Sequence, residues 1–138
     1  VDSKVDRDLS DKERKDELWK QTCFEFFVKK SEHKNYFEFN ASPKGQWNFY
    51  RFSDYRSPIE KENSINHIKM SSVQQGQWKV LVYKLDLNPL FKPGDSLLFS
   101  FSAVVKQGVE VSYWAHKHSA EKPDFHHVNN FTIEAKFK

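Results

Sequence analysis

A histidine-rich segment near the C-terminus, YWAHKHSAEKPDFHH, combines residue types that could ligate a metal or line a binding pocket. It covers residues 113–127 and holds four of the six histidines of the chain. His116 and His118 share one face if the segment is extended, and neutral imidazoles are ligands for zinc or copper. His126 and His127 are adjacent, so at most one of them would converge with that pair. A transition-metal site built from these four histidines is one hypothesis.

The single methionine offers a second use for the same histidines. Met70 and one histidine of the segment could form a Met/His axial pair for haem. A lone methionine is more often part of a hydrophobic core, so packing is the competing interpretation.

Side chains able to act in catalysis are present, but without the surroundings that catalysis needs. Ser119 and Asp124 accompany the histidines, yet no Gly-x-Ser-x-Gly elbow presents a nucleophile. Cys23 lies among bulky aromatic residues, where an inert buried thiol is the common outcome. Glu25 and Glu38 could form a carboxylate pair for glycoside hydrolysis, although inward-facing carboxylates more often meet an arginine or a hydroxyl. We therefore predict a protein without catalytic residues.

A different set of side chains suits the binding of a carbohydrate. Glycan-binding sites use flat aromatic rings, on which the apolar face of a pyranose stacks, and a few polar groups that bond to hydroxyls. Trp19 opens the first clear strand pattern, Glu25 follows six residues later, and Phe125 lies in the histidine-rich segment. Further polar groups are predicted from Gln46, Arg51 and His126. The competing interpretation is that Trp19 and Phe125 only cap the ends of the core.

The elements that must position these residues are predicted to be strands, because the hydrophobic pattern from Leu18 onward has a period of two. Aromatic residues, which favour strands, make up 16% of the chain. The alternating runs are residues 22–30, 36–41, 46–52, 68–73, 77–87, 96–105, 109–114 and 130–137. The turn sequence SPKG at 42–45 joins the second and third runs as a hairpin. We predict an all-β, antiparallel, jelly-roll-like β-sandwich in a single domain over residues 18–138.

Residues 1–17 have a different composition from the rest of the chain. Twelve of these 17 residues are charged and very few are apolar. Ser10 and Glu13 match a capping box, but no apolar face accompanies them. The sequence therefore predicts a charged flexible segment or linker ahead of the folded domain.

The overall charge and hydropathy exclude some partners. Lysine and arginine number 22 and aspartate and glutamate 19, and the resulting net charge of +3 is not concentrated in a basic run. This argues against a nucleic-acid partner. No apolar run approaches the roughly 20 residues that a membrane span needs. Cys23 is the one cysteine, so no internal disulfide is expected.

Three segments resemble the bacterial DOMON-like type 9 proteins, which are similar to family 9 carbohydrate-binding modules. The segments are LWKQTCFEFF (18–27), YFEFNASPKGQWNFYRF (36–52) and SYWAHKHSAEKPDFHHVNNFTIE (112–134), in the expected order. In the glycan-binding relatives, two aromatic residues clamp a terminal sugar. The first is a Trp six residues before a Glu, matched here by Trp19 and Glu25. The second lies six residues before a Phe, a spacing that Phe125 and Phe131 reproduce with Phe in place of the relatives' Trp.

The resemblance implies a jelly-roll-like sandwich that binds carbohydrate without catalysis and needs no cofactor. A glycan end would lie between Trp19 and Phe125, with Glu25 accepting hydrogen bonds from vicinal hydroxyls. The alternative is a redox module of the DOMON type, which would hold haem or a transition metal at the histidine-rich segment. The relatives usually carry about two strands before the LW motif, so N-terminal strands could be absent. The compartment stays open: periplasmic or secreted if a leader is missing, and otherwise cytoplasmic.

Overall fold

A computed structural model describes residues 4–10, 13–55, 57–115, 117 and 124–138, and its regular structure is β-strand apart from two short 3-10 turns. The strands are β1 (Lys4–Asp8), β2 (Cys23–Lys30), β3 (Tyr36–Ala41), β4 (Trp47–Phe52), β5 (Glu60–Lys61), β6 (Ile68–Gln75), β7 (Trp78–Leu85), β8 (Ser96–Gln107), β9 (Glu110–Ala115) and β10 (Ile133–Lys136). The turns are η1 (Leu18–Lys20) and η2 (Val128–Asn130). In the part of the chain that the structure describes, no helix is long and apolar enough to cross a membrane.

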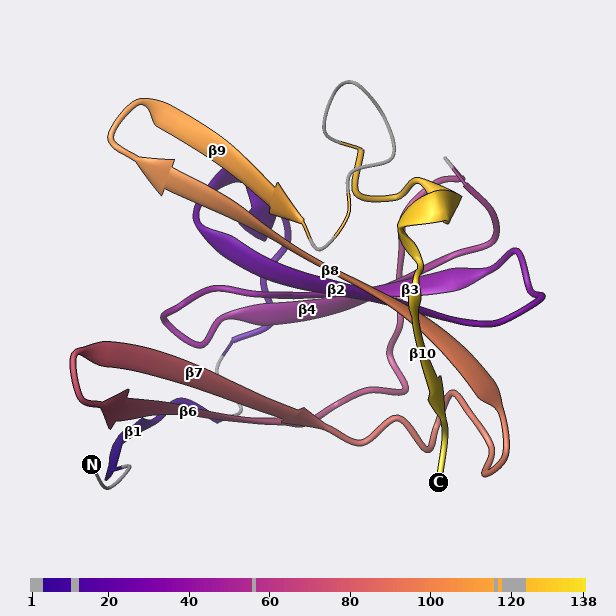
Figure 1. Ribbon diagram of the computed structural model, residues 1–138, viewed down its shortest axis with the longest axis horizontal. Helices are drawn as coiled ribbons and strands as arrows, with labels where there is room; N and C mark the ends of the chain where they lie inside the picture. Colours follow the sequence, from indigo (N-terminus) through magenta and orange to yellow (C-terminus); the bar gives the residue numbers. More distant parts are fainter. Residues whose placement is uncertain (1–3, 11–12, 56, 116, 118–123) are drawn as a thin grey trace.

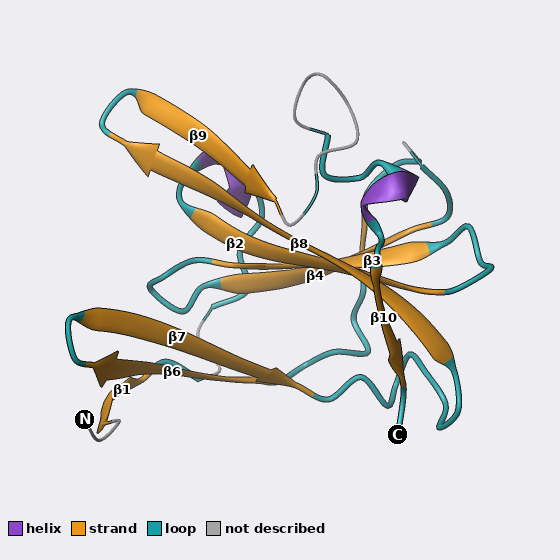
Figure 2. Cartoon of the chain, viewed as in Figure 1, coloured by secondary structure: helices purple, strands orange, loops and turns teal. Residues whose placement is uncertain are grey.

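The strands form two antiparallel sheets that lie one over the other (Figures 1 and 2). The larger sheet has the order β10-β8-β2-β3-β4-β5, and β9 also pairs with β8. The smaller sheet has the order β1-β6-β7. The prediction of an all-β antiparallel sandwich in one domain is confirmed, whereas its jelly-roll connectivity stays a prediction.

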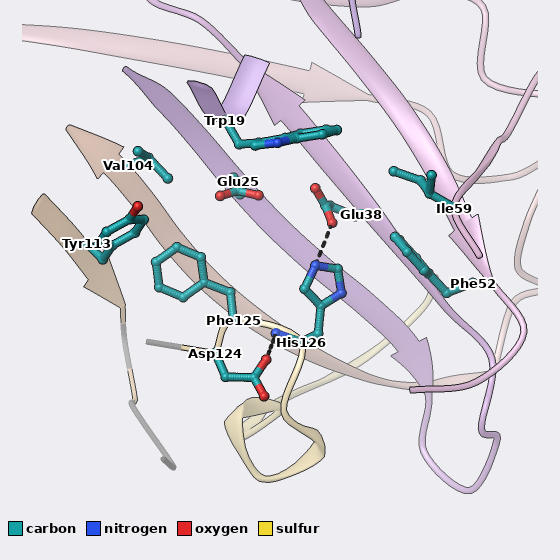
Figure 3. Close-up of a pocket in the computed structure, with 10 residues that line it drawn as sticks. All are labelled: Trp19, Glu25, Glu38, Phe52, Ile59, Val104, Tyr113, Asp124, Phe125 and His126. Atoms are coloured by element: carbon teal, nitrogen blue, oxygen red, sulfur yellow. Dashed lines mark hydrogen bonds and ion pairs between the residues drawn. The ribbon is translucent and has the colours of Figure 1, made fainter. Parts of the chain in front are cut away.

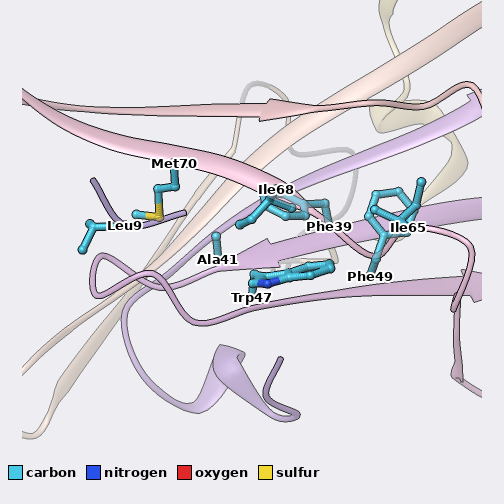
Figure 4. Packing of buried hydrophobic residues seen from close by; sticks show 8 residues of the cluster. All are labelled: Leu9, Phe39, Ala41, Trp47, Phe49, Ile65, Ile68 and Met70. Carbon is cyan, nitrogen blue, oxygen red and sulfur yellow. The ribbon is translucent and has the colours of Figure 1, made fainter. Parts of the chain in front are cut away.

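The two sheets enclose a core that is rich in aromatic residues. Phe39 and Ala41 from β3 and Trp47 and Phe49 from β4 pack against the β6 side chains Ile68 and Met70 (Figure 4). Phe26 from β2 meets Phe39 edge to face, with 5.3 Å between the ring centroids. Because successive side chains of a strand point to opposite faces, the residues between these positions point away from the smaller sheet.

The long strand β8 determines where the chain leaves and re-enters the larger sheet. One edge of β8 pairs with β2 from Leu97 to Val104. Its other edge is shared, because β10 pairs with Ser96–Phe99 and β9 pairs with Ser102–Gln107. The connection from β9 to β10 therefore leaves the sheet beside Ser102 and returns to it beside Phe99, both near the middle of β8. Its described end, residues 124–132, lies over the face of the larger sheet that points away from the smaller sheet.

The predicted flexible linker over residues 1–17 was wrong for the residues that the structure describes. β1 pairs with β6 in antiparallel register, and Leu9 is 2% exposed within the core between the sheets. The sequence pattern missed this strand because its few apolar residues stand among charged ones. Pairing with β6 and burial of Leu9 are tertiary contacts, which outweigh a weak local pattern.

Arg14 fixes the rest of this segment to the edge of the larger sheet. Its Nε and Nη2 atoms donate to Oδ1 of Asn48 at 3.0 and 2.8 Å, and its guanidinium lies 4.8 Å from the centre of the Trp47 ring. It also donates to the backbone carbonyls of Phe49, Glu62 and Ile65. Asp16 in turn accepts from Asn48 Nδ2 and from the Tyr50 hydroxyl, both at 2.9 Å. Two of the charges that suggested a solvated linker, those of Arg14 and Asp16, are thus bound to fixed partners.

Replacing Leu9 with alanine tests whether this segment belongs to the domain. We expect the free energy of unfolding to fall by about 2–4 kcal/mol, because a buried leucine is truncated in a close-packed core. Denaturant unfolding followed by tryptophan fluorescence measures the change. Val109 is 98% exposed, and Val109→Ala is a matched control that should change stability by less than about 0.5 kcal/mol. Equal small effects of both substitutions would contradict the burial of Leu9.

Candidate functional site

The outer face of the larger sheet carries a cleft of about 340 Å³ beside the described end of the β9–β10 connection. Aromatic and carboxyl side chains dominate its lining (Figure 3). The lining residues are Trp19, Glu25, Glu38, Phe52, Ile59, Val104, Tyr113, Asp124, Phe125 and His126. We call this feature the cleft. It lies on the face of the sheet opposite the core that contains Phe39 and Phe49.

The floor of the cleft is polar because of the strand register. Glu25 on β2 stands opposite Ser102 on β8 and opposite Asn40 on β3, and Asn40 stands opposite Asn48 on β4. All four side chains are buried, so a polar row crosses four neighbouring strands. Glu38 lies two residues before Asn40 on β3, which makes it the diagonal neighbour of Glu25. This geometry brings two buried carboxyl groups together.

Burial and mutual proximity favour retention of a proton by the two carboxyl groups. Burial raises the pKa of Glu25 well above its usual value, and the charge of Glu38 and a hydrogen bond to it raise the pKa further. Burial also raises the pKa of Glu38, while His126, the hydrogen bond from Glu25 and the nearby Asn40 amide lower it. These directions favour Glu25 as the protonated partner, because two adjacent carboxylates cannot both stay ionised away from water.

Asn40 and Ser102 stand on either side of Glu25 in the sheet, but neither forms a hydrogen bond of normal geometry with it. Neither the Asn40 amide atoms nor the Ser102 hydroxyl has a hydrogen-bond partner of normal geometry among the described residues. Buried polar groups of a folded protein are mostly paired. Spare hydrogen-bonding capacity is therefore present in the buried layer beside the carboxyl pair, although Asn40 and Ser102 do not themselves line the cleft.

His126 links the β9–β10 connection to the carboxyl pair. Its Nε2 lies 3.2 Å from Oε1 of Glu38, and its Nδ1 lies 2.8 Å from the Tyr36 hydroxyl. A neutral ring satisfies both contacts when Nε2 donates to the carboxylate and Nδ1 accepts from Tyr36. The rings of Phe27 and Phe52 lie edge-on to the imidazole, with centroids at 4.9 and 5.0 Å. These contacts together fix the orientation of the His126 ring.

The backbone around His126 is fixed by Asp124 and Asn130. Asp124 Oδ1 accepts from the His126 amide at 3.2 Å, and the Tyr55 hydroxyl donates to Oδ2 of Asp124. Asn130 is fully buried, and its Nδ2 donates to the Asp124 carbonyl at 2.7 Å. Phe131 follows it into the aromatic cluster on this face. Phe125 is thereby held at the rim of the cleft, 6.1 Å from the Tyr113 ring between centroids.

Trp19 is positioned by the turn η1 at the opposite side of the cleft. Leu18 is buried and anchors the turn, while Glu17 enters it with a left-handed backbone (φ 61°), which is uncommon outside glycine. The Trp19 ring meets Tyr50 edge to face, with centroids 6.1 Å apart. Tyr50 is itself held by Asp16, so the network around Arg14 supports this wall.

The structure brings together four of the six residues predicted for a sugar site. Trp19, Glu25, Phe125 and His126 all line the cleft. Figure 3 shows the two carboxyl groups between the ring of Trp19 and the rings of Phe125 and His126.

The structure does not bring Gln46 and Arg51 into the cleft. Gln46 lies at the end of the β3–β4 turn, where its carbonyl accepts from the Ser42 amide. Arg51 has the same strand parity as Trp47 and Phe49, and its Nε donates to Glu60 Oε2 at 2.8 Å. The alternation of the strand therefore directs Arg51 away from the face that carries the cleft.

Of the four histidines predicted as metal ligands, the structure describes two, His126 and His127, and the metal site stays a prediction. His116 and His118 lie outside the described residues. His126 contacts Glu38, whereas Nδ1 of His127 accepts from the Asn129 amide and caps η2. No group of three or more histidine, cysteine and acidic residues that could hold a metal ion occurs in the described chain. Met70 is buried between the sheets, across the larger sheet from His126, so these two residues do not fit an axial pair for haem.

Several lining residues were not predicted as part of a sugar site. Glu38 was considered only as half of a catalytic pair, although its position between buried aromatic residues of a strand is the signal that marks it. Asp124 was considered only beside a possible catalytic nucleophile, and Phe52, Ile59, Val104 and Tyr113 were not singled out. No local pattern identifies them, because they come from separate strands and loops.

Comparisons with known proteins establish the fold and little else. No family model matches the chain, and no curated protein matches it. Among solved structures, the chain is similar to the crystal structure of a candidate carbohydrate-binding protein from Bacteroides uniformis, with a TM-score of 0.65 and 16% identity. The match covers 99% of this chain and 68% of that one. At this identity the likeness shows a shared sandwich fold, and the resemblance to DOMON-like proteins stays a prediction.

Replacing Glu25 with glutamine tests the shared proton. A folded-state pKa above the unfolded value of 4.5 gives stability that is complete below that value and is lost as the pH rises through the raised pKa. Glu25→Gln removes this loss, so we expect the variant to be more stable than the parent at about pH 8, by at least about 1 kcal/mol, and not at about pH 4. Denaturant unfolding at a series of pH values measures the difference.

The exposed Glu110 supplies the control for this experiment. Glu110→Gln should leave the pH profile of the parent unchanged. A stability difference for Glu25→Gln that is the same at every pH would show that Glu25 does not hold a proton in the folded protein.

Proposed function

We propose that this chain is a non-catalytic carbohydrate-binding module that holds a glycan end or a small sugar in the cleft. The observation that carries the proposal is the convergence of Trp19 and Phe125, from opposite ends of the sequence, over buried polar groups on one sheet face. Aromatic walls accept the apolar face of a pyranose, and carboxyl oxygens accept hydrogen bonds from its hydroxyls. The cleft volume of about 340 Å³ is at the lower end of the range for small-molecule sites.

The arrangement of the carboxyl groups supports binding without hydrolysis. Glycosidases keep their two carboxyl groups at least about 5 Å apart, so that a glycosidic bond or a water fits between them. Glu25 and Glu38 are instead both buried, at 7% and 3% exposed, and Oε1 of Glu38 is already bound by His126. Neither carboxyl group therefore projects freely into the cleft, as an acid and a nucleophile on the two sides of a glycosidic bond must.

The fold is compatible with this proposal. The similar structure from Bacteroides uniformis is described as a candidate carbohydrate-binding protein. The same sandwich fold can carry many functions, so the proposal depends on the residues of the cleft. The fold is consistent with carbohydrate binding but is not evidence for it.

Removing either aromatic wall should weaken sugar binding. We expect micromolar or weaker dissociation constants for the parent protein, and losses of about tenfold or more for Trp19→Ala and for Phe125→Ala. The reason is that each ring supplies a stacking surface that alanine lacks. Isothermal titration calorimetry with a panel of mono- and disaccharides measures the affinities.

Arg51→Ala is the matched control, because Arg51 was predicted as a rim residue and lies outside the cleft. Its sugar affinity should equal that of the parent. The absence of heat with every sugar of the panel would refute the proposed function. An unchanged affinity in both aromatic variants would place the binding site elsewhere.

A further inference from the structure

The cleft is strongly acidic in relation to its size. Three of its lining residues are carboxylic acids, Glu25, Glu38 and Asp124, and none of its described lining residues is a lysine or an arginine. His126 is the nitrogen base among them, and it is already bonded to Glu38 and Tyr36. A neutral sugar has no charge with which to compensate these acids.

Glu25, unlike Glu38 with its contact to His126, has no cationic partner among the described residues. Buried carboxylates in proteins are normally paired with a cation or a metal. Glu25 is 7% exposed and has a second acid as its partner. Beside it, the buried side chains of Asn40 and Ser102 have no hydrogen-bond partner of normal geometry in the described chain. The carboxyl oxygens of Glu25 and Glu38, which line the cleft, are the acceptors that it offers to a ligand with several N–H donors.

The walls of the cleft suit a cation as well as a sugar ring. Trp19, Phe52, Tyr113 and Phe125 line the same space. The faces of aromatic rings attract ammonium groups, and tryptophan does so most strongly. Figure 3 shows the Trp19 ring next to the carboxyl groups of Glu25 and Glu38, so that both kinds of cation contact are available in one place.

We propose that the cleft selects a sugar with a free amino group, which it binds as an ammonium ion between the carboxyl groups of Glu25 and Glu38 and the ring of Trp19. This inference rests on the proposed carbohydrate binding and names its ligand class. The ammonium group brings three N–H donors to the carboxyl oxygens of Glu25 and Glu38. Its positive charge takes the place of the proton that the two acids share.

Binding of an amino sugar therefore releases a proton. With the ammonium ion in place, both carboxyl groups are ionised and the proton of Glu25 passes to the solvent. The other titratable groups around the pair are Cys23, Tyr36, Tyr50, Tyr113, Asp124 and His126. Burial raises the pKa values of the Cys23 thiol and of the Tyr36 and Tyr50 hydroxyls, so these three groups keep their protons.

Calorimetry with three related monosaccharides tests the inference. Glucosamine carries the amine, N-acetylglucosamine has the same ring with the charge removed, and glucose has a hydroxyl at that position. At about pH 6, where the amine is protonated, we expect glucosamine to bind about tenfold or more tightly than the other two, the effect of one charge-assisted hydrogen bond. The heat of glucosamine binding should differ between phosphate and Bis-Tris buffers, because their ionisation enthalpies differ and a proton is released.

Two variants test whether Glu25 and Glu38 cause the preference for glucosamine. In Glu25→Gln and in Glu38→Gln, the ratio of the glucosamine and glucose affinities should fall to within about threefold, while the exposed-site control Glu110→Gln keeps the ratio of the parent. Thermal unfolding confirms that each variant is folded.

The outcomes separate the two proposals. Equal binding of all three sugars, a ratio that persists in both glutamine variants, or a heat that is independent of the buffer would overturn the selection of an amino sugar and leave carbohydrate binding intact. The absence of binding to all three sugars would overturn both proposals.

Discussion

The burial of two adjacent carboxyl groups among aromatic rings is the constraint on which the outer face of the larger sheet depends. Glu25 and Glu38 can share this space only because one of them keeps a proton and His126 donates to the other. His126 in turn needs Tyr36 and an ordered backbone around it. The contact between His126 and Glu38 is thus one of the interactions that hold the described end of the β9–β10 connection over the sheet, where it forms one wall of the cleft.

The larger sheet separates two environments that have different chemistry. Its inner face packs on the smaller sheet through Phe39, Phe49 and their neighbours, and this apolar core stabilises the domain. Its outer face is covered by η1 and by the segment that contains η2, which bury most of the aromatic residues there but leave Trp19 and Phe125 partly exposed. Because a strand alternates its side chains between faces, β2 and β3 supply core residues and cleft residues in turn. Stability and binding therefore depend on different side chains of the same strands.

The N-terminal segment connects these two environments. Leu9 contributes to the inner core, while Arg14 and Asp16 hold the polar side chains of β4 and, through Tyr50, the wall that contains Trp19. One stretch of charged sequence thereby supports both faces. The similar structure from Bacteroides uniformis shares this sandwich at 16% identity, which shows how little of the fold depends on particular side chains. The cleft, by contrast, depends on the identity of a few residues.

The sequence by itself determined the strand class, the hairpin at residues 42–45 and the candidates Trp19, Glu25, Phe125 and His126. These features are local, since alternation and turn residues are visible in short windows. Only the tertiary structure decided that residues 4–8 form a strand, that Arg51 points away from the cleft and that Glu38 is the partner of Glu25. Such outcomes depend on pairing register between distant segments, and a shift of one residue would place each of these side chains on the other face. The candidate residues were therefore predictable one by one, whereas the carboxyl pair and the cleft around it were decided by the sheet.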